Sequence, residues 1–329
     1  MKKYTPILML FAALTFCSCS QPYTKITGFA EGTTYSITYS SRKSYKTEIE
    51  NLLHQFENSL SVYNQESAIS KVNRNEPVEL DSFFTGCFEL SKEVNLRTNG
   101  AFDISASPLF SAWGFGKEER TKQLSRHAID SLMAFCGMDK IRIEGSSIVK
   151  KDSRVQLNCN AVAKGYSVDV VAGFLKRKGV ASYLVEIGGE IAGRGVNKKG
   201  RCWSIGIDKP VDGSCIPGEQ LQATMQLCNK GLATSGNYRR FFVENGQKFG
   251  HTINPKTGYP VTHSLLSATV IANDCGTADA FATALMVVGL DSAKHLLNSN
   301  RDLEGYLIYN DNNELKTYAT AGFEKMLLP

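Results

Sequence analysis

The chain mixes two hydrophobic repeats, one typical of helices and one typical of strands. Apolar residues recur at helical spacing in residues 48–60, where Ile49, Leu53, Phe56 and Leu60 would share one face. The same repeat predicts further helices at residues 83–96, 128–137, 161–178, 277–288 and 291–297. Residues 104–113 are expected to form a connector around a central proline.

Shorter runs alternate apolar and polar residues or are rich in β-branched side chains, which is the pattern of strands. They predict hairpins at residues 24–40 and 141–148, and strands at residues 183–187, 190–194, 203–207, 222–228, 238–244, 248–253, 265–272, 303–309 and 314–318. Strands and helices do not alternate as regular strand–helix–strand units. The pattern therefore predicts an α+β fold with a mainly antiparallel sheet and packed helices.

The composition of the 329 residues is that of a globular protein, with 42% hydrophobic and 21% charged residues. The formal net charge is +5. It falls to +3 if Lys2 and Lys3 are lost with a signal peptide. A charge this small and this dispersed argues against a nucleic-acid partner.

The first residues have the parts of an export signal. Lys2 and Lys3 precede an apolar stretch at residues 7–16 that is too short to span a bilayer comfortably. Cys19 follows Ser18, a small residue that suits cleavage before a lipidated cysteine. The sequence thus predicts a signal peptide at residues 1–18, a tether at residues 19–23 that begins with lipidated Cys19, and one domain at residues 24–329.

A lipidated chain would be anchored to a membrane without spanning it, and we expect it on the periplasmic side of the bacterial inner membrane. An ordinary cleaved signal and a buried apolar helix remain as alternatives for the same residues. No later segment is long and apolar enough to cross a membrane.

Seven cysteines follow the signal, and none of them forms a C-x-x-C pair, which excludes a zinc ribbon or a thioredoxin motif. Export permits disulfides, and the odd number leaves at least one thiol free or paired outside the chain. The expectation is that most are buried free thiols. They are Cys87, Cys136, Cys159, Cys202, Cys215, Cys228 and Cys275.

The segment H-T-I-N-P-K-T-G-Y-P-V at residues 251–261 follows a β-prone run and predicts a stiff turn. Pro255 fixes its own φ, Gly258 tolerates a conformation that other residues avoid, and Pro260 favours an extended residue before it. The turn would present the imidazole of His251 among hydrogen-bonding groups. A surface turn with an incidental histidine is the alternative.

Two helix starts carry candidate chemistry. In the apolar helix, Asp279 and Thr283 are four residues apart and share a face, a hard-oxygen pair that suits Mg²⁺. Alternatively, Asp279 caps the helix and Thr283 packs. Lys164 lies one turn into the helix that follows Asn158, where free N–H groups and a positive charge could bind phosphate. A plain helix start with a solvated lysine is the alternative.

Other segments are weaker signals. Gly188 and Gly189 follow a strand but do not form the G-x-G-x-x-G dinucleotide fingerprint. The turns around Tyr63 and Phe102 could each place an aromatic ring against a planar ligand, although core packing is commoner. Arginines at positions 239 and 240 could bind phosphate or carboxylate, or form a surface ion pair.

Taken together, these segments resemble the ApbE family of flavin transferases. The matching segments are G-T-T-Y-S-I at residue 32, L-S-V-Y-N-Q-E-S at residue 60, G-A-F-D-I-S at residue 100, N-A-V-A-K-G-Y at residue 160, V-E-I-G-G-E-I at residue 185, T-S-G-N-Y-R-R-F at residue 234, the turn at residues 251–261 and A-D-A-F-A-T-A-L at residue 278. The resemblance implies an FAD site in a cleft between subdomains. It also implies Mg²⁺-dependent transfer of the FMN moiety of FAD to a protein threonine.

The resemblance also assigns roles by position. It implies that FAD is bound by Tyr63, Ala101, Phe102, Asp103, Lys164 and Ile253, with Asn158 in an altered contact. It implies that Mg²⁺ is bound by Asp279 and Thr283 with backbone oxygens of Ala161 and Ala282. His251 and Asp279 are the candidates for accepting the proton of the attacking hydroxyl.

Two residues depart from the family pattern. Many relatives have methionine at the position of Glu31 and aspartate at the position of Asn158. Asparagine keeps a hydrogen-bonding role and loses a charge, so an FAD contact there is expected to be altered.

The family's acceptors imply partners such as subunits of a sodium-pumping quinone reductase or of electron-transport complexes. Two other functions stay open: an FAD pyrophosphatase that forms FMN and AMP, and a periplasmic FAD-binding lipoprotein without turnover.

Overall fold

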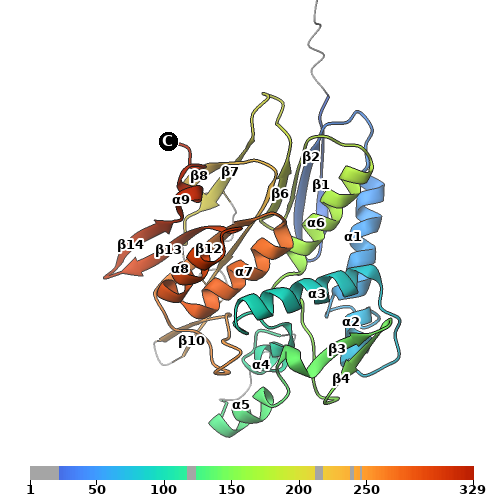
Figure 1. The fold of residues 1–329 in the computed structure, drawn as a ribbon, viewed down its shortest axis with the longest axis vertical. Helices are drawn as coiled ribbons and strands as arrows, with labels where there is room; N and C mark the ends of the chain where they lie inside the picture. The colour runs from blue at the N-terminus through green and yellow to red at the C-terminus, as the bar shows by residue number, and fades with distance from the viewer. Residues whose placement is uncertain (1–21, 117–123, 212–217, 238–240, 245–246) are drawn as a thin grey trace, which may run out of the picture.

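The computed structural model describes residues 22–116, 124–211, 218–237, 241–244 and 247–329 (Figure 1). The helices are α1 (Lys46–Leu60), α2 (Ala68–Asn73), α3 (Ser82–Arg97), α4 (Ser107–Ala112), α5 (Arg126–Met133), α6 (Ala163–Arg177), α7 (Cys275–Val288), α8 (Leu290–Ser299) and α9 (Ala321–Glu324). Short 3₁₀ turns lie at Ile104–Ala106 and Met138–Lys140.

The strands are β1 (Thr24–Ala30), β2 (Thr33–Tyr39), β3 (Ile141–Glu144), β4 (Ser147–Lys150), β5 (Tyr183–Ile187), β6 (Glu190–Arg194), β7 (Trp203–Asp208), β8 (Leu221–Leu227), β9 (Lys230–Gly236), β10 (Phe241–Glu244), β11 (Gln247–Gly250), β12 (Leu265–Ala272), β13 (Glu304–Asp311) and β14 (Glu314–Ala319). Eight of them form one sheet in the order β1-β2-β5-β6-β9-β12-β13-β14, with every neighbouring pair antiparallel. The hairpins β3–β4, β7–β8 and β10–β11 lie outside this sheet. The predicted α+β class and antiparallel sheet are confirmed.

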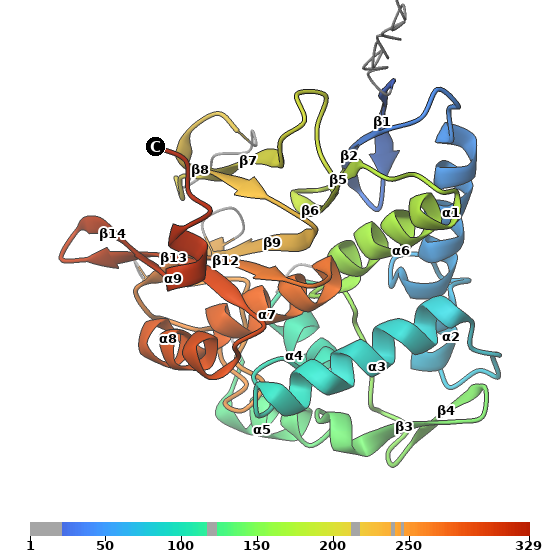
Figure 2. The ribbon, with the colours of Figure 1, turned by 45° about the horizontal axis from the view of Figure 1, so that its top comes forward.

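Helices cover one face of the sheet, with α6 on β5 and β6 and α7 on β9 and β12 (Figure 2). At β6, β9, β12 and β13 the other face is buried as well, because Trp203 of β7 and Phe323 of α9 pack there. Successive side chains of a strand point to opposite faces of the sheet, so one strand packs against both layers. In β9, Leu232 faces the β7–β8 side, while the next residue, Ala233, packs under the helices. The strands under α7 are thus buried on both faces and give the helix a rigid base.

Two segments differ from the expected structure. The expected connector at residues 104–113 contains a 3₁₀ turn and then α4, because Pro108 lies in the first helical turn, where its missing N–H costs no hydrogen bond. Strand β9 was not expected, since K-G-L-A-T-S-G has few β-favouring residues. Its pairing with β6 and β12 makes it a central strand. The short helices α2 and α9 were not expected either.

The cysteines are partly as expected. Cys87, Cys136, Cys159 and Cys275 are buried free thiols. By contrast, Cys202 and Cys228 form a disulfide across the start of β7 and the end of β8, with Cα atoms 5.2 Å apart. Cys215 and the arginines at 239 and 240 lie outside the described residues.

Removing this disulfide is expected to destabilise the protein. The Cys202–Cys228 bond closes a loop with a sequence separation of 26, and a loop of that size restricts the unfolded chain by roughly 3 kcal/mol. The double variant Cys202→Ala/Cys228→Ala should lose about that much free energy of unfolding in urea. Reduction of the wild type should have a similar effect. A double variant as stable as the wild type would contradict the prediction.

The expected signal peptide and the lipidated Cys19 lie outside the described residues. Within the described ranges, no helix is both long enough and apolar enough to cross a membrane.

Candidate active site

One cavity of about 1090 Å³ lies where the β1–β2 turn, the end of α1, the β5–β6 turn, the β7–β8 hairpin, β9 and α7 meet. Nearly all the residues that the sequence singled out line it: Tyr63, Ala101, Phe102, Asp103, Asn158, Ala161, Lys164, His251, Ile253, Asp279 and Thr283. The exception is Ala282, which is fully buried in α7 and does not line the cavity. Segments separated by more than 200 residues in sequence thus share one site.

Three oxygen-bearing residues form what we call the metal corner: Asp279, Thr283 and Ala161. The Asp279 carboxylate accepts the backbone N–H of Gly165 at 3.0 Å. One turn along α7, the Thr283 hydroxyl donates to the carbonyl of Ala161 at 3.3 Å. The alternative role for Asp279 as a helix cap is wrong, because Asp274 caps α7 by accepting the N–H of Thr277.

The metal corner is electrostatically unfavourable for a bare carboxylate. Burial, followed by the negative charge of Glu190, raises the pKa of Asp279 to about 7. Burial alone would lower the pKa of Lys164, but the carboxylates of Glu190 and Asp279 outweigh it and the pKa is raised. Lys164 also contacts Glu190 directly, with Nζ 2.6 Å from Oε1. The alternative of a solvated lysine at a plain helix start is therefore wrong.

These residues fit a small hard cation. Among the described residues, no group of three or more histidine, cysteine, aspartate or glutamate side chains could hold a metal ion. The metal corner offers instead one carboxylate with neutral hydroxyl and carbonyl oxygens, the donor set of Mg²⁺ sites that keep waters and bridge phosphates. A divalent cation would also remove the electrostatic reason for the raised pKa of Asp279.

Another part of the cavity offers an aromatic platform. Tyr63 is 56% exposed, and its hydroxyl accepts a hydrogen bond from the Asn160 side chain at 3.4 Å. Asn158 uses its side-chain oxygen to accept the N–H of Asn160 at 2.9 Å. The hydrogen-bonding role expected of Asn158 thus includes shaping its own loop, which places Asn160 against the ring.

The segment at residues 101–103 is fixed from beneath. The Asp103 carboxylate accepts both the N–H and the hydroxyl of Ser105. Burial raises its pKa, although these hydrogen bonds oppose the shift. Phe102 is buried and its carbonyl accepts the Asn95 amide at 2.7 Å. These contacts fix the cavity wall at residues 101–103 before any ligand binds.

The turn at residues 251–261 forms as predicted. Asn254 accepts the N–H of Gly258 at 2.8 Å, and Gly258 has a φ of +77°. The indole of Trp113 donates to the Gly258 carbonyl at 2.8 Å, which ties the turn to α4. His251 precedes the turn, with its ring centroid 6.2 Å from that of Phe115. The imidazole is therefore at the cavity wall on a braced support.

Sequence reasoning did not single out five carboxylates of the cavity: Glu31 as a site residue, Glu57, Glu186, Glu190 and Asp208. The signal for two of them was present in V-E-I-G-G-E-I, where acidic residues flank a glycine turn. Glu186 accepts the N–H of Gly189 at 2.8 Å, which stabilises that turn. Glu190, in turn, pairs with Lys164 across the sheet and α6. These partners are far apart in sequence, so spacing alone could not pair them.

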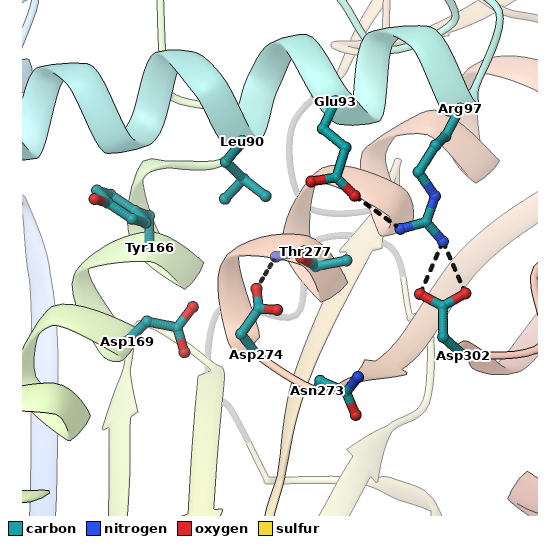
Figure 3. Close-up of a pocket in the computed structure, with 9 residues that line it drawn as sticks. All are labelled: Leu90, Glu93, Arg97, Tyr166, Asp169, Asn273, Asp274, Thr277 and Asp302. Atoms are coloured by element: carbon teal, nitrogen blue, oxygen red, sulfur yellow. Dashed lines mark hydrogen bonds and ion pairs between the residues drawn. The ribbon is translucent and has the colours of Figure 1, made fainter.

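A second cavity, of about 400 Å³, lies at the start of α7 and shares no lining residue with the first (Figure 3). Arg97 of α3 reaches across it to both carboxylate oxygens of Asp302. Asp169 of α6 accepts the N–H groups of Cys275 and Gly276, at 2.9 and 2.7 Å. Arg97 thus ties α3 to the segment between α8 and β13, and Asp169 ties α6 to the start of α7, the two helices that carry or adjoin the metal corner.

Comparisons with known proteins agree with this geometry. The model of the ApbE family matches residues 32–307. An FAD:protein FMN transferase from Haemophilus influenzae is 36% identical over 99% of this chain and 98% of its own length. The corresponding protein from Vibrio cholerae is 32% identical over 98% of each chain.

Solved structures are equally similar. The flavin transferase ApbE from Vibrio cholerae superposes with a TM-score of 0.82 at 31% identity, over 93% of this chain and 99% of that one. The apo form of the flavinyl transferase ApbE from Pseudomonas stutzeri has a TM-score of 0.83 at 30% identity, over 93% and 96%. The fold, the cavity and the sequence agree, and this chain belongs to the ApbE family.

Proposed function

We propose that this protein transfers the FMN moiety of FAD to a threonine hydroxyl of an acceptor protein, in a reaction that needs Mg²⁺ and releases AMP. The observation that carries the proposal is one cavity lined by the metal corner, the charged Lys164 and the exposed ring of Tyr63. A dinucleotide requires such a ring platform, and its pyrophosphate requires positive charge. The relatives named FAD:protein FMN transferase support the same reaction.

The residues of the cavity have different roles in the proposed reaction. Mg²⁺ held by Asp279, Thr283 and the Ala161 carbonyl would offset charge on the pyrophosphate and the leaving AMP. Lys164 adds a fixed positive charge beside it. The threonine oxygen attacks the phosphorus on the FMN side, a new P–O bond forms, and the anhydride bond to AMP breaks.

His251 is our choice to accept the proton of the threonine hydroxyl. An imidazole ordinarily titrates near neutral pH, which suits a general base. Asp279 is the less suitable candidate, because a carboxylate that holds a cation is a weaker base.

We further propose that Cys19 carries a lipid and holds the enzyme on the periplasmic side of the bacterial inner membrane. Its acceptors would then be membrane-associated flavoprotein subunits, such as those of a sodium-pumping quinone reductase or of electron-transport complexes. The Cys202–Cys228 disulfide agrees with an oxidising compartment.

Mass spectrometry of an acceptor domain tests the function. The full chain in detergent is incubated with FAD, Mg²⁺ and a domain that carries a candidate threonine. A mass gain of one FMN moiety that a chelator abolishes supports transfer. FAD consumed to FMN and AMP, with an unmodified acceptor, would make the protein a pyrophosphatase. No AMP under any condition would leave only FAD binding.

His251→Ala is expected to slow transfer by roughly 100- to 10,000-fold while FAD affinity stays unchanged, because general bases contribute that much. Single-turnover transfer and FAD titration measure the two quantities separately. The exposed His127, on α5, provides the control, and His127→Ala should keep the wild-type rate. A His251→Ala enzyme with the full transfer rate would remove this residue from the chemistry.

A further inference from the structure

The segment V-E-I-G-G-E-I at residues 185–191 contacts the side chain of Lys164 in two places. Gly188 and Gly189 form the two-residue turn between β5 and β6. A Cβ at Gly188 would lie 3.2 Å from Cδ of Lys164, so the glycine leaves room for the stem of the lysine. The ammonium at the end of that stem lies 2.6 Å from Oε1 of Glu190, the first residue of β6. The segment therefore contacts both the stem and the charged end of Lys164.

The two charges of this ion pair are exposed to different degrees. The side chain of Glu190 is 4% exposed, whereas that of Lys164 is 38% exposed. Both residues line the 1090 Å³ cavity. An ammonium has three N–H donors, so a bond to Glu190 leaves two donors for a ligand. The pair thus presents a held positive charge to the cavity while its carboxylate stays buried.

A second carboxylate, that of Asp279, lies close to the same lysine. Asp279 accepts the N–H of Gly165, the residue after Lys164, at 3.0 Å. Burial lowers the pKa of Lys164, and the charges of Glu190 and then Asp279 raise it above its usual value. Without the charge of Glu190, Asp279 is the one of these two carboxylates that remains to attract the ammonium.

We propose that Glu190 is a positioning residue for flavin transfer: its carboxylate holds the ammonium of Lys164 toward the pyrophosphate of FAD and away from Asp279. The inference rests on the proposed function, in which Lys164 binds that pyrophosphate and Asp279 binds Mg²⁺. Glu190 acts on the reaction through Lys164, and it keeps the carboxylate of the metal corner free for the cation.

Simple charge repulsion by Glu190 would have the opposite effect on binding. A carboxylate in the cavity repels an anionic ligand, so the loss of its charge alone would tighten FAD binding. The loss of a group that positions Lys164 would weaken FAD binding, because the ammonium turns toward Asp279. The direction of the change in affinity therefore separates positioning from repulsion.

FAD titrations with a chelator present test the inference, because they measure binding without magnesium and without turnover. Glu190→Gln keeps the size of the side chain and removes its charge. It should bind FAD roughly tenfold more weakly, as expected when one hydrogen bond to a charged group is lost. Glu48→Gln removes the carboxylate of the exposed Lys43–Glu48 pair and is the control that should match the wild type.

The conservative variant Glu190→Asp separates positioning by charge from a structural role. It keeps the charge on a shorter side chain, so it should lose less FAD affinity than Glu190→Gln. A structural role would give the reverse order, because glutamine is the closer fit in the place of a buried glutamate.

A double-mutant cycle with Lys164→Met shows whether Glu190 acts through the lysine. Adding Glu190→Gln to Lys164→Met should cause no further loss of FAD affinity, because no ammonium remains to be positioned. The double variant leaves neither charge of the pair without its partner. This comparison therefore decides the matter even if Glu190→Gln alone does not fold.

Stabilisation by magnesium in urea unfolding is a second readout. Glu190→Gln should need a roughly tenfold higher magnesium concentration than the wild type, because the ammonium competes for Asp279, and changes around metal ligands have effects of this size. The double variant should respond at a lower concentration than Glu190→Gln, since the competing ammonium is gone. The unfolding midpoint in chelator shows whether each variant is folded.

Unchanged or tighter FAD binding by folded Glu190→Gln would overturn the inference, as would a smaller loss for Glu190→Gln than for Glu190→Asp. A further loss of affinity in the double variant, or a wild-type magnesium response of Glu190→Gln, would also overturn it. Each result could occur in an enzyme that still transfers FMN, so the proposed function would stand. A wild type that binds no FAD at all would overturn both.

Discussion

Asp279→Asn is expected to abolish flavin transfer and, at the same time, to make the metal-free protein more stable. The asparagine oxygen can still accept the N–H of Gly165, so the local hydrogen bond survives. The negative charge is lost, and with it the principal ligand of the metal corner. Second-shell changes around metals already cost 10–100-fold, so transfer should fall by at least roughly 100-fold.

The gain in stability follows from the pKa of Asp279, which rises from 3.8 to about 7 on folding. A carboxyl group whose pKa is raised in the folded state binds its proton more tightly there, so stability falls as pH rises from about 4 to about 7. Each pKa unit is worth roughly 1.4 kcal/mol. The variant should therefore exceed the metal-free wild type by a few kcal/mol at pH 8.5 and by less at pH 5.5, in urea unfolding with chelator.

Magnesium should narrow this difference. A ligand at 100 times its dissociation constant stabilises the folded state by about 2.7 kcal/mol, and the wild type should gain this while Asp279→Asn gains little. Asp169→Asn is the matched control: burial also raises the pKa of Asp169 to about 7, yet this residue lines the other cavity (Figure 3). Its magnesium response should persist. An Asp279→Asn protein with a full magnesium response would place the metal elsewhere.

The sequence predicts the bounds of a strand best where a local hydrophobic pattern coincides with burial in the fold. Strands β5, β6 and β12 have the predicted bounds, and most of their residues are buried in the sheet. Strand β9 lacks such a pattern and depends on pairing with neighbours at distant sequence positions. Its role as a central strand is a tertiary effect that no local propensity encodes.

The residues of the site also fall into two groups, those that a local sequence pattern identifies and those that it does not. Motif residues such as Asp279 and Thr283 were identified because a helical repeat puts them on one face, and the structure places them in one cavity. The Lys164–Glu190 pair, the buried carboxyl of Glu31 and the Cys202–Cys228 disulfide were not identified. Each depends on a contact between elements whose distance in space the sequence pattern does not fix.

Gly165→Ala is expected to damage both stability and transfer through a single methyl group. Gly165 lies in the first turn of α6, where a Cβ would be 2.5 Å from the carbonyl oxygen of Cys275 and 2.6 Å from Cβ of Asp279. Backbone and Cβ atoms cannot rotate away, so α6 and α7 would have to separate. Overpacking of this kind costs about 1–3 kcal/mol, against a helix-propensity gain of at most about 1 kcal/mol.

Gly173, which lies in the same helix, is the control position. A Cβ at Gly173 would only meet the Arg177 guanidinium at 3.4 Å, an ordinary contact with a flexible group. Gly173→Ala should therefore stabilise the protein by up to about 1 kcal/mol in urea unfolding, while Gly165→Ala destabilises it.

The functional effect of Gly165→Ala should exceed the effect on stability. Moving α6 from α7 breaks the bond from the Gly165 N–H to Asp279 and shifts Ala161 relative to Thr283. A displacement of about 1 Å costs a reaction roughly 100-fold, so transfer and magnesium stabilisation should both be lost in a protein that still folds. If Gly165→Ala instead matched Gly173→Ala in stability and kept the wild-type rate, the close approach of α6 and α7 would not be what sets the geometry of the metal corner.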